Sequence, residues 1–301
     1  MRPRSPSLTA EAVCFIRAAD ALRPSEQRVV DDPYARHFLR RSARALLAAL
    51  ATNRRADTAF DTAFAWLATG LVTYVRCRHR FIDDALRRAL EAHEVDQVVV
   101  LGAGYDARAW RFAELLAGVP VFEVDYPTTG ARKAKILAAK LPDRPAVDVR
   151  AVAVDFEAQR LDERLLAAGF EPGRRTFFLW EGVSLYLTRA AVKATLATLA
   201  QLGGPGSRLA LDLFQQADRP DLRGTMYRMS GSALHLLGEP VTFVLHAEDA
   251  PDFLARAGWG VRDLANAREL RRRYVRDGRG VYPMAYAVDA RWTDVSEGAA
   301  P

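Results

Sequence analysis

Residues 97–106, QVVVLGAGYD, restrict the fold of this chain more than any other stretch, together with Asp125, which follows Gly104 by 21 positions. A continuous β-branched run is typical of a parallel strand that is buried on both faces. The Gly-x-Gly turn directly after it lets the backbone approach a ligand before a helix begins. An acidic residue about 20 positions later, at the end of the next strand, is placed to accept hydrogen bonds from a ribose diol. The stretch therefore predicts the first βαβ unit of a nucleotide-type cofactor site.

Strand and helix patterns alternate after this unit. Apolar runs predict strands at residues 97–101, 120–124, 148–154, 176–180 and 207–214, and a late pair at 259–264 and 281–288 that an Arg-rich segment separates. Helical spacing of apolar residues predicts helices at residues 107–116, 128–141, 161–168, 188–202 and 250–257. This alternation predicts an α/β fold of the Rossmann-like, doubly wound type, with a mostly parallel seven-stranded sheet that has an antiparallel late strand.

The first 95 residues have mostly helical patterns. Helices are predicted at residues 9–22, in pieces from a turn at 31–35 to residue 50, and at 59–92. Because no linker separates them from the sheet, residues 1–95 are predicted to form an N-terminal helical lid on a core of residues 96–301, in one compact unit. A lid insertion with a short helix around 222–237 is predicted near residues 215–246.

The composition indicates which binding partners and which cellular compartment to expect. The chain has 301 residues, 43 basic and 37 acidic, and a net charge of +6. Because its Arg residues are spread among carboxylates, a nucleic-acid-binding surface is the less favoured interpretation. Cys14 and Cys77 are too few and too far apart for a disulfide framework or a four-ligand zinc site, so two buried thiols in a reducing interior are expected. No signal sequence or membrane span is indicated, and a cytoplasmic protein without a membrane partner or metal is predicted.

The glycine motif alone leaves the cofactor open. Residues 102–107, GAGYDA, satisfy the Gly-x-Gly-x-x-Ala pattern of NAD-dependent dehydrogenases. Four carboxylates fall at the predicted strand ends, where an α/β sheet binds its ligand: Asp106, Asp125, Asp155 and Glu181. A pyrophosphate at the first helix favours bare backbone donors over an adjacent carboxylate. S-adenosylmethionine carries a sulfonium, an ammonium and a ribose diol, so the carboxylates favour this cofactor.

Each candidate also has a structural alternative. Arg78 is a candidate for a bidentate contact with the methionine carboxylate of the cofactor, and otherwise a surface Arg. Asp106 is equally well explained as a helix N-cap, and Asp155 as a turn residue. Asp125 is the most specific candidate, because strand, spacing and residue type agree. Glu181 ends an apolar strand, where a buried carboxylate without a partner would be costly.

Several sequence blocks, spread over most of the chain, match a known family. They are SLTA at 7–10, DPYA at 32–35, RHRFID at 78–83, LGAGYDAR at 101–108, FEVDYP at 122–127 and EGVSLYL at 181–187. Together they resemble the leucine carboxyl methyltransferase-like family of class I S-adenosylmethionine-dependent methyltransferases. The beginning of the chain and the late GEP block at 238–240 are most similar to the bacterial small-molecule O-methyltransferase branch.

The resemblance implies the methyltransferase version of the doubly wound sheet, with S-adenosylmethionine as cofactor. It implies that Arg78 binds the methionine carboxylate, that Glu181 lies near the methionine amine, and that Asp125 binds the ribose. Asp155 and Phe156 would flank the adenine. The remaining predicted cofactor-binding residues belong to the same motifs and are Gly102, Ala103, Gly104, Asp106 and Tyr126.

The resemblance does not fix the acceptor, because family members methylate a protein C-terminal carboxylate, a modified tRNA base, or small bacterial metabolites such as aromatic polyketide acids. We expect O-methylation of a carboxylate or phenol on a small molecule of secondary metabolism. A carboxylate, with a reference pKa of roughly 4, needs no general base, whereas a phenol, at roughly 10, benefits from one. Tyr186 is a candidate for acceptor contact and His235 and His246 for the base, although packed or exposed loop histidines are the favoured explanation.

Other functions stay open at this point. Met226, Tyr227 and Met229 are candidates for an apolar acceptor pocket, but core packing explains them better. The chain also fits a carboxyl methyltransferase acting on a protein C-terminus or modified tRNA, a non-catalytic cofactor-binding module, or an NAD-dependent oxidoreductase. The oligomeric state is open too, with a homodimer among the options.

Overall fold

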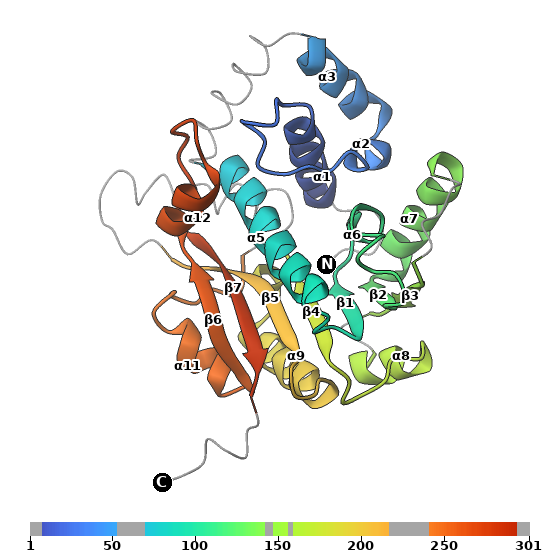
Figure 1. Cartoon of the computed structure of the whole chain (residues 1–301), viewed down its shortest axis with the longest axis vertical. Coiled ribbons are helices and arrows are strands. Elements are labelled where there is room, and N and C mark those ends of the chain that lie inside the picture. Colours follow the sequence, from blue (N-terminus) through green and yellow to red (C-terminus); the bar gives the residue numbers. More distant parts are fainter. Residues whose placement is uncertain (1–7, 53–69, 142–146, 156–158, 217–240, 294–301) are drawn as a thin grey trace.

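The computed structural model describes residues 8–52, 70–141, 147–155, 159–216 and 241–293. Within these ranges, seven strands form one sheet in the order β3-β2-β1-β4-β5-β7-β6 (Figure 1). The strands are β1 Gln97–Leu101, β2 Val121–Asp125, β3 Val149–Ala153, β4 Thr176–Trp180, β5 Arg208–Phe214, β6 Trp259–Ala265 and β7 Ala285–Trp292. Strands β1 to β5 pair in parallel, and β7 is antiparallel to both of its neighbours. The predicted fold class is confirmed.

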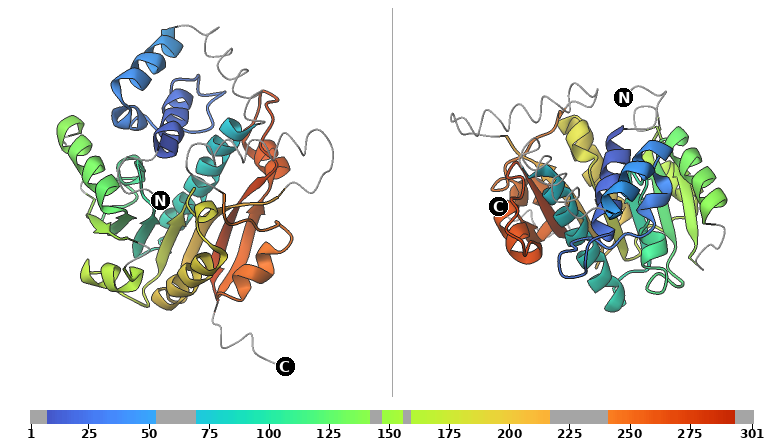
Figure 2. Two further views of the ribbon diagram at one scale, coloured as in Figure 1. Left: turned by 180° about the vertical axis from the view of Figure 1, so that it is seen from behind. Right: turned by 90° about the horizontal axis from the view of Figure 1, so that it is seen from above.

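The central strands are buried on both faces. Every residue of β1, β4 and β5 is buried, as expected for strands that helices cover on both sides. On one face, α5 (Leu71–Glu91) packs over alternate strand residues. On the other, α8 (Leu161–Ala167), α9 (Arg189–Leu202) and α11 (Ala250–Ala255) cover the residues between them. Figure 2 shows α9, in yellow, in front of the sheet in the rear view and α5 behind it.

Three N-terminal helices lie beyond the end of the sheet at which the parallel strands finish (Figure 1). They are α1 (Leu8–Ala21), α2 (Ala35–Phe38) and α3 (Arg41–Thr52). A separate apolar cluster joins these helices to the loop after β1. Within this cluster, Phe38 of α2 stacks on Tyr105 of the loop, with ring centroids 5.4 Å apart. The helices predicted at residues 9–22 and up to residue 50 are confirmed, and they cover the edge that carries the glycine motif.

Three predicted elements differ from the structure. The helix predicted at 107–116 is only one turn, α6 (Arg108–Arg111), because Arg108 and Arg111 both donate to Asp83 and hold this turn against α5. The Arg-rich segment, for which the sequence indicates solvated Arg residues but no helix bounds, contains α12 (Ala267–Tyr274), which the Asn266 side chain caps. The last strand begins at residue 285 and not at 281.

Several other predicted features agree with the described residues. Helix α7 (Pro127–Lys140) follows β2 as predicted, and the Thr188 side chain caps α9. Both cysteines are free and buried. No helix in the described ranges is long and apolar enough to cross a membrane. The helical predictions for residues 59–69 and 222–237 lie outside the described residues.

Candidate functional site

The ends of neighbouring strands meet at one edge of the sheet. Leu101 of β1 is level with Val124 of β2 and Trp180 of β4 in the pairing register. The residues that follow these three, Gly102, Asp125 and Glu181, therefore lie side by side at the end of the sheet. The Val154 N–H donates to the Asp125 backbone carbonyl at 2.9 Å, which brings Asp155 to the same edge. The sequence-predicted carboxylates are therefore gathered by the parallel topology, as expected for a ligand site in an α/β sheet.

The turn after β1 requires glycine at its first position. Gly102 has a φ of 64°, and a Cβ there would lie 2.4 Å from Val183 Cγ2. The Gly104 N–H donates to the Asp125 carboxylate, whose second oxygen accepts from the Tyr126 N–H at 2.6 Å. Burial raises the pKa of Asp125. Asp125 thus closes the glycine turn from the adjacent strand, and Ala103 lies buried between the two glycines.

Asp106 precedes the short helix that follows the turn. Its Oδ1 accepts from the Arg108 N–H at 2.7 Å, and its Oδ2 accepts from the guanidinium of the same residue. Burial alone would raise the pKa of Asp106, but the charges of Arg108, Lys133 and Arg17 together outweigh burial and lower it. The N-cap residue is Ala107, without a side-chain cap, so the N-cap explanation for Asp106 is wrong, although its carboxylate accepts from the first N–H group of the helix.

Glu181 lies at the centre of a buried group of charges. Its carboxylate accepts from Arg78 Nε at 3.1 Å and from Arg108 Nη2 at 2.7 Å, and His79 Nδ1 lies 3.1 Å away. Burial opposes ionisation of Glu181, but His79, through its hydrogen bond, and the charges of Arg108 and Arg78 together hold its pKa well below the ordinary value. Asp83 anchors the far side by accepting from Arg108 Nε at 2.7 Å. Glu181 is thus a fixed, ionised carboxylate.

Asp212, in the middle of β5, is a site residue that the sequence analysis missed. It accepts from Arg78 Nη1 at 2.8 Å and from the Gly182 N–H at 2.6 Å. Gly182 has a φ of 70°, and a Cβ there would lie 3.3 Å from Arg78 Nη2. Asp212 and Glu181 together hold the guanidinium of Arg78 at the sheet edge. The available signal was one carboxylate within the apolar strand RLALDLF, residues 208–214.

Further charged residues around this group were also missed. The Arg17 guanidinium of α1 donates to the Tyr105 backbone carbonyl at 2.7 Å and lies 3.4 Å from Asp32. This pair ties the N-terminal helices to the glycine loop. Arg108 and Arg111 lie in α6, where the sequence predicted a helix but no role for either side chain. For His79 and Asp83, the sequence block RHRFID was the only indication.

Other predicted residues lie apart or are not described. Tyr186 is in a 3₁₀ turn (Ser184–Tyr186) after β4, partly buried against the core on the α5 face. His246 lines a cavity with Arg189, Asp249 and Phe253, and this cavity shares no residue with the Glu181 group. Phe156, His235 and the candidate pocket residues Met226, Tyr227 and Met229 lie outside the described residues.

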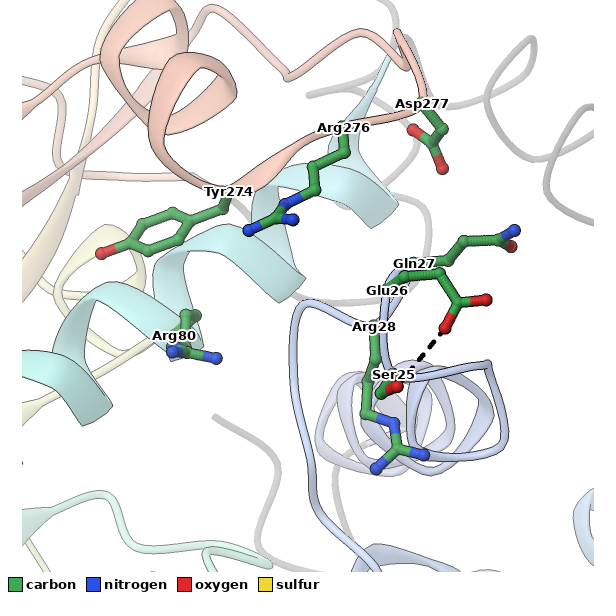
Figure 3. A pocket seen from close by; sticks show the side chains of 8 residues that line it. All are labelled: Ser25, Glu26, Gln27, Arg28, Arg80, Tyr274, Arg276 and Asp277. Atoms are coloured by element: carbon green, nitrogen blue, oxygen red, sulfur yellow. Dashed lines mark hydrogen bonds between the residues drawn. The ribbon is translucent and has the colours of Figure 1, made fainter.

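Figure 3 shows a different cavity, of about 420 Å³, lined by residues 25–28 together with Arg80, Tyr274, Arg276 and Asp277. Arg80 lies two residues after Arg78 on α5, about 200° around the helix, so this cavity opens on another side of α5. Arg80 donates to Asp84 at 2.8 Å and Arg28 lies 2.9 Å from Asp31. Because these charges are already paired, the cavity is a poor match for the chemistry predicted at the glycine motif.

The charge pattern distinguishes the two cofactors that the glycine motif allows. A pyrophosphate needs backbone N–H donors at the glycine turn and the first helix, but carboxylates occupy the N–H groups of Gly104 and Arg108. A ligand with an ammonium, a sulfonium and a ribose diol meets carboxylates at Asp125, Glu181 and Asp212, and its own carboxylate meets Arg78. The residues therefore fit S-adenosylmethionine, and they do not fit a dinucleotide.

Two solved structures have a fold similar to this seven-stranded sheet and its helices. A DUF574 family protein from Streptomyces avermitilis has a TM-score of 0.57 at 13% identity, over 79% of this chain and 90% of that protein. A candidate methyltransferase from Thermobifida fusca has a TM-score of 0.56 at 14% identity, over 93% of this chain and 94% of that one. The strand order with antiparallel β7 is that of the class I methyltransferase fold.

Sequence comparisons define the family. The leucine carboxyl methyltransferase family model matches residues 10–200. A protein of Parafrankia sp., named as a candidate S-adenosyl-L-methionine-dependent methyltransferase, is 35% identical over 88% of this chain and 81% of its own. One from Mycolicibacterium vanbaalenii with the same description is 31% identical over 88% of each chain. The chain belongs to the leucine carboxyl methyltransferase family and is an S-adenosylmethionine-dependent methyltransferase.

Proposed function

We propose that this protein is an O-methyltransferase that methylates a carboxylate, or a phenol, of a small metabolite such as a polyketide-type natural product. The observation that carries the proposal is the group of four carboxylates at the ligand-binding edge of the sheet, of which Asp106 and Asp212 are buried and Asp125 and Glu181 partly buried. Family membership supports methyl transfer from S-adenosylmethionine. The small acceptor rests on the resemblance of the chain to bacterial small-molecule members.

The donor roles follow from the charges at the edge. Against the described residues, Arg78 uses two of its five N–H donors, on Glu181 and Asp212, which leaves donors for the methionine carboxylate. Glu181 is held ionised for the methionine amine. Asp125, at the end of β2, takes the ribose hydroxyls through the acceptor sites that its bonds to Gly104 and Tyr126 leave on its two oxygens.

The other proposed donor contacts come from the same edge. The loop from Gly102 to Gly104, with Ala103, approaches the methionine moiety, and Tyr126 begins the helix beside the ribose. Asp155, with Phe156, is proposed to flank the adenine. Asp106 acts through its bond to the Arg108 N–H and through the Arg108 side chain, which reaches Glu181.

The transferred group sets what the protein must supply. When bound, S-adenosylmethionine supplies an electrophilic methyl group on a positively charged sulfur. The protein must hold an acceptor oxygen in line with that group and exclude water, because positioning accounts for much of the rate. A carboxylate acceptor is ionised at neutral pH and needs no base, whereas a phenol would need one, for which His235 and His246 stay the candidates.

The acceptor side is proposed to be covered by the N-terminal helices. Helices α1 to α3 lie over the edge that holds the glycine loop (Figure 1), and Tyr186 follows Glu181 by five positions in the next turn. We assign the lid role to the N-terminal region 1–95 and to the insertion near 215–246, on the core 96–301, with Tyr186 as an acceptor contact.

Methyl transfer to matched acceptors tests the proposal. The purified protein is incubated with S-adenosylmethionine and pairs of aromatic acids and phenols of the same size, and the products are analysed by mass spectrometry. The expected product is a methyl ester, formed at a rate that is nearly flat between about pH 6 and 9 because the carboxylate is already ionised. A rate that rises with pH identifies a phenol acceptor. Methylation of only a protein C-terminus or tRNA contradicts the small-acceptor proposal.

A further inference from the structure

His79 is fully buried beside Glu181 and has no role in the donor contacts described above. It precedes Arg80 on α5 and is 0% exposed. Its Nδ1 lies 3.1 Å from Glu181 Oε2, and its Nε2 lies 2.8 Å from Arg111 Nη1. A buried imidazole with a partner on each nitrogen has a defined proton position, and the identity of the partners reveals it.

The partners assign the proton to Nδ1. A guanidinium only donates, so the Nε2 that faces Arg111 must accept and carries no proton. The single proton of the neutral ring is therefore on Nδ1, from which it is donated to Glu181. Arg111 cannot turn away, because it also donates to Asp83 and, at 2.9 Å, to the Asp31 backbone carbonyl.

Arg108 makes one contact that this tautomer does not satisfy. Arg108 Nη2 lies 2.9 Å from His79 Nδ1, where two N–H groups face each other. Arg108 Nη2 has other acceptors, because it also donates to Glu181 Oε2 at 2.7 Å and to the His79 backbone carbonyl at 3.4 Å. Burial, followed by the charge of Arg108, lowers the pKa of His79, and the nearby carboxylates of Asp83 and Glu181 do not reverse this direction. The ring is therefore neutral.

A neutral donor suits this position for an electrostatic reason. Two guanidinium groups, from Arg78 and Arg108, already contact the Glu181 carboxylate. A third cation there would cancel the negative charge that an incoming ammonium requires. A neutral N–H fixes the orientation of the carboxylate by a hydrogen bond and adds no positive charge.

We propose that His79 is a positioning residue for the methyl donor, which as the neutral Nδ1–H tautomer orients the Glu181 carboxylate toward the donor's methionine amine. The inference rests on the proposed role of Glu181 in that contact. His79 does not touch the ligand; it acts through Glu181, and Arg111 and Asp83 act through His79. The consequence is selective: loss of the His79 donor weakens recognition of the amino-acid end of the ligand and leaves recognition of the adenosine end intact.

Three substitutions separate the donor from the packing of the ring. His79→Asn keeps an amide N–H near the position of Nδ1, His79→Gln places its amide near the position of Nε2, and His79→Leu removes both nitrogens. His93→Asn, at an exposed position just after the same helix, is the matched control. Calorimetry measures the affinity of each purified full-length variant for S-adenosylhomocysteine and for 5′-methylthioadenosine, which lacks the amino-acid end. Thermal unfolding reports whether each variant is folded.

The expected pattern is specific to the ligand. His79→Asn and the His93 control bind S-adenosylhomocysteine nearly as the unmodified protein does. His79→Gln and His79→Leu bind it about tenfold or more weakly, as expected for loss of a hydrogen bond to a charged group. All four bind 5′-methylthioadenosine without change. A loss for both ligands, or equal losses for the Asn and Leu variants, assigns His79 a packing role and overturns the inference.

Glu181→Gln distinguishes failure of this inference from failure of the proposed function. If Glu181→Gln binds S-adenosylhomocysteine normally, the donor role of Glu181 is wrong and the inference is lost with it. If Glu181→Gln loses affinity but every His79 variant keeps it, only the inference is overturned. A long-range ¹H–¹⁵N spectrum of the unmodified protein is an independent check: it should show an unprotonated Nε2 on His79, and a protonated Nε2 contradicts the assignment.

Discussion

Replacement of Gly182 by alanine tests how closely the backbone must approach Arg78. Gly182 has a φ of 70°, and the new Cβ would lie 3.3 Å from Arg78 Nη2 and 3.4 Å from Nη1. The left-handed backbone alone costs an alanine about 1–2 kcal/mol. For a chain of 301 residues, this corresponds to a fall of about 2–3 °C in Tm, since the unfolding entropy is roughly 2 cal/mol/K per residue.

The contact with Arg78 adds an effect on binding that the backbone cost does not explain. Displacement of the guanidinium would weaken the hydrogen bonds that we propose it makes to the methionine carboxylate, and a hydrogen bond to a charged group is worth about 1.5–3 kcal/mol. We therefore expect Gly182→Ala to bind S-adenosylhomocysteine about tenfold or more weakly than the unmodified protein.

Gly173→Ala is the matched control for this prediction. Gly173 has a φ of 79°, and a Cβ there meets nothing within 4 Å, so this variant has the same backbone cost without the contact. Calorimetry with S-adenosylhomocysteine and thermal unfolding of both variants provide the comparison. Equal affinities for the ligand in the two variants, at similar Tm, would refute the argument that Arg78 binds the donor from this position.

Three further predictions concern stability. Asp212→Ala removes one of the two carboxylates that hold the buried Arg78 guanidinium and should lower the unfolding free energy in urea by about 3 kcal/mol. Asp162→Ala, whose partner Arg160 is largely solvated, should change it little, and similar losses in both variants would contradict this difference. Asp83, Asp106 and Glu181 have depressed pKa values when folded, so their stabilisation is present above the unfolded pKa of roughly 4 and is lost as the pH falls below it. Tm should therefore decline steeply below about pH 4, less steeply in Asp83→Asn, and a Tm that rises on acidification is the opposite of what we expect. Asn266→Ala removes the cap of α12 and should cost about 1 kcal/mol, whereas an unchanged Tm would show that α12 does not depend on its cap.

The strands were predictable because a strand that is buried on both faces is a continuous run of apolar residues in the sequence. The run 97–101 and the strand 176–180 are apolar at nearly every position, and the structure assigns the same bounds. Asp125 was predictable for a related reason, because a fixed spacing joins two adjacent parallel strands. The meeting of Gly102, Asp125 and Glu181 then follows from the parallel register alone.

The missed features depend on contacts between distant residues. Asp212 reaches Arg78 across 134 positions, and no spacing rule identifies such a pair. Helix α12 is strongly polar and buries only Leu270, so it lacks the stripe of several apolar residues by which a helix is predicted, and its cap is the main signal. The tautomer of His79 depends on Arg111, 32 positions away. Asp106 shows a local case, in which the carboxylate bonds to the N–H of Arg108 only two positions away.

The central claim is that the carboxylates at the sheet edge select a methyl donor over a dinucleotide. Calorimetric titration of the purified protein with S-adenosylmethionine, and separately with NAD, tests this claim most directly. We predict saturable binding of S-adenosylmethionine and no binding of NAD, because the N–H groups of Gly104 and Arg108 are already occupied by Asp125 and Asp106. Binding of NAD without binding of S-adenosylmethionine would contradict the account.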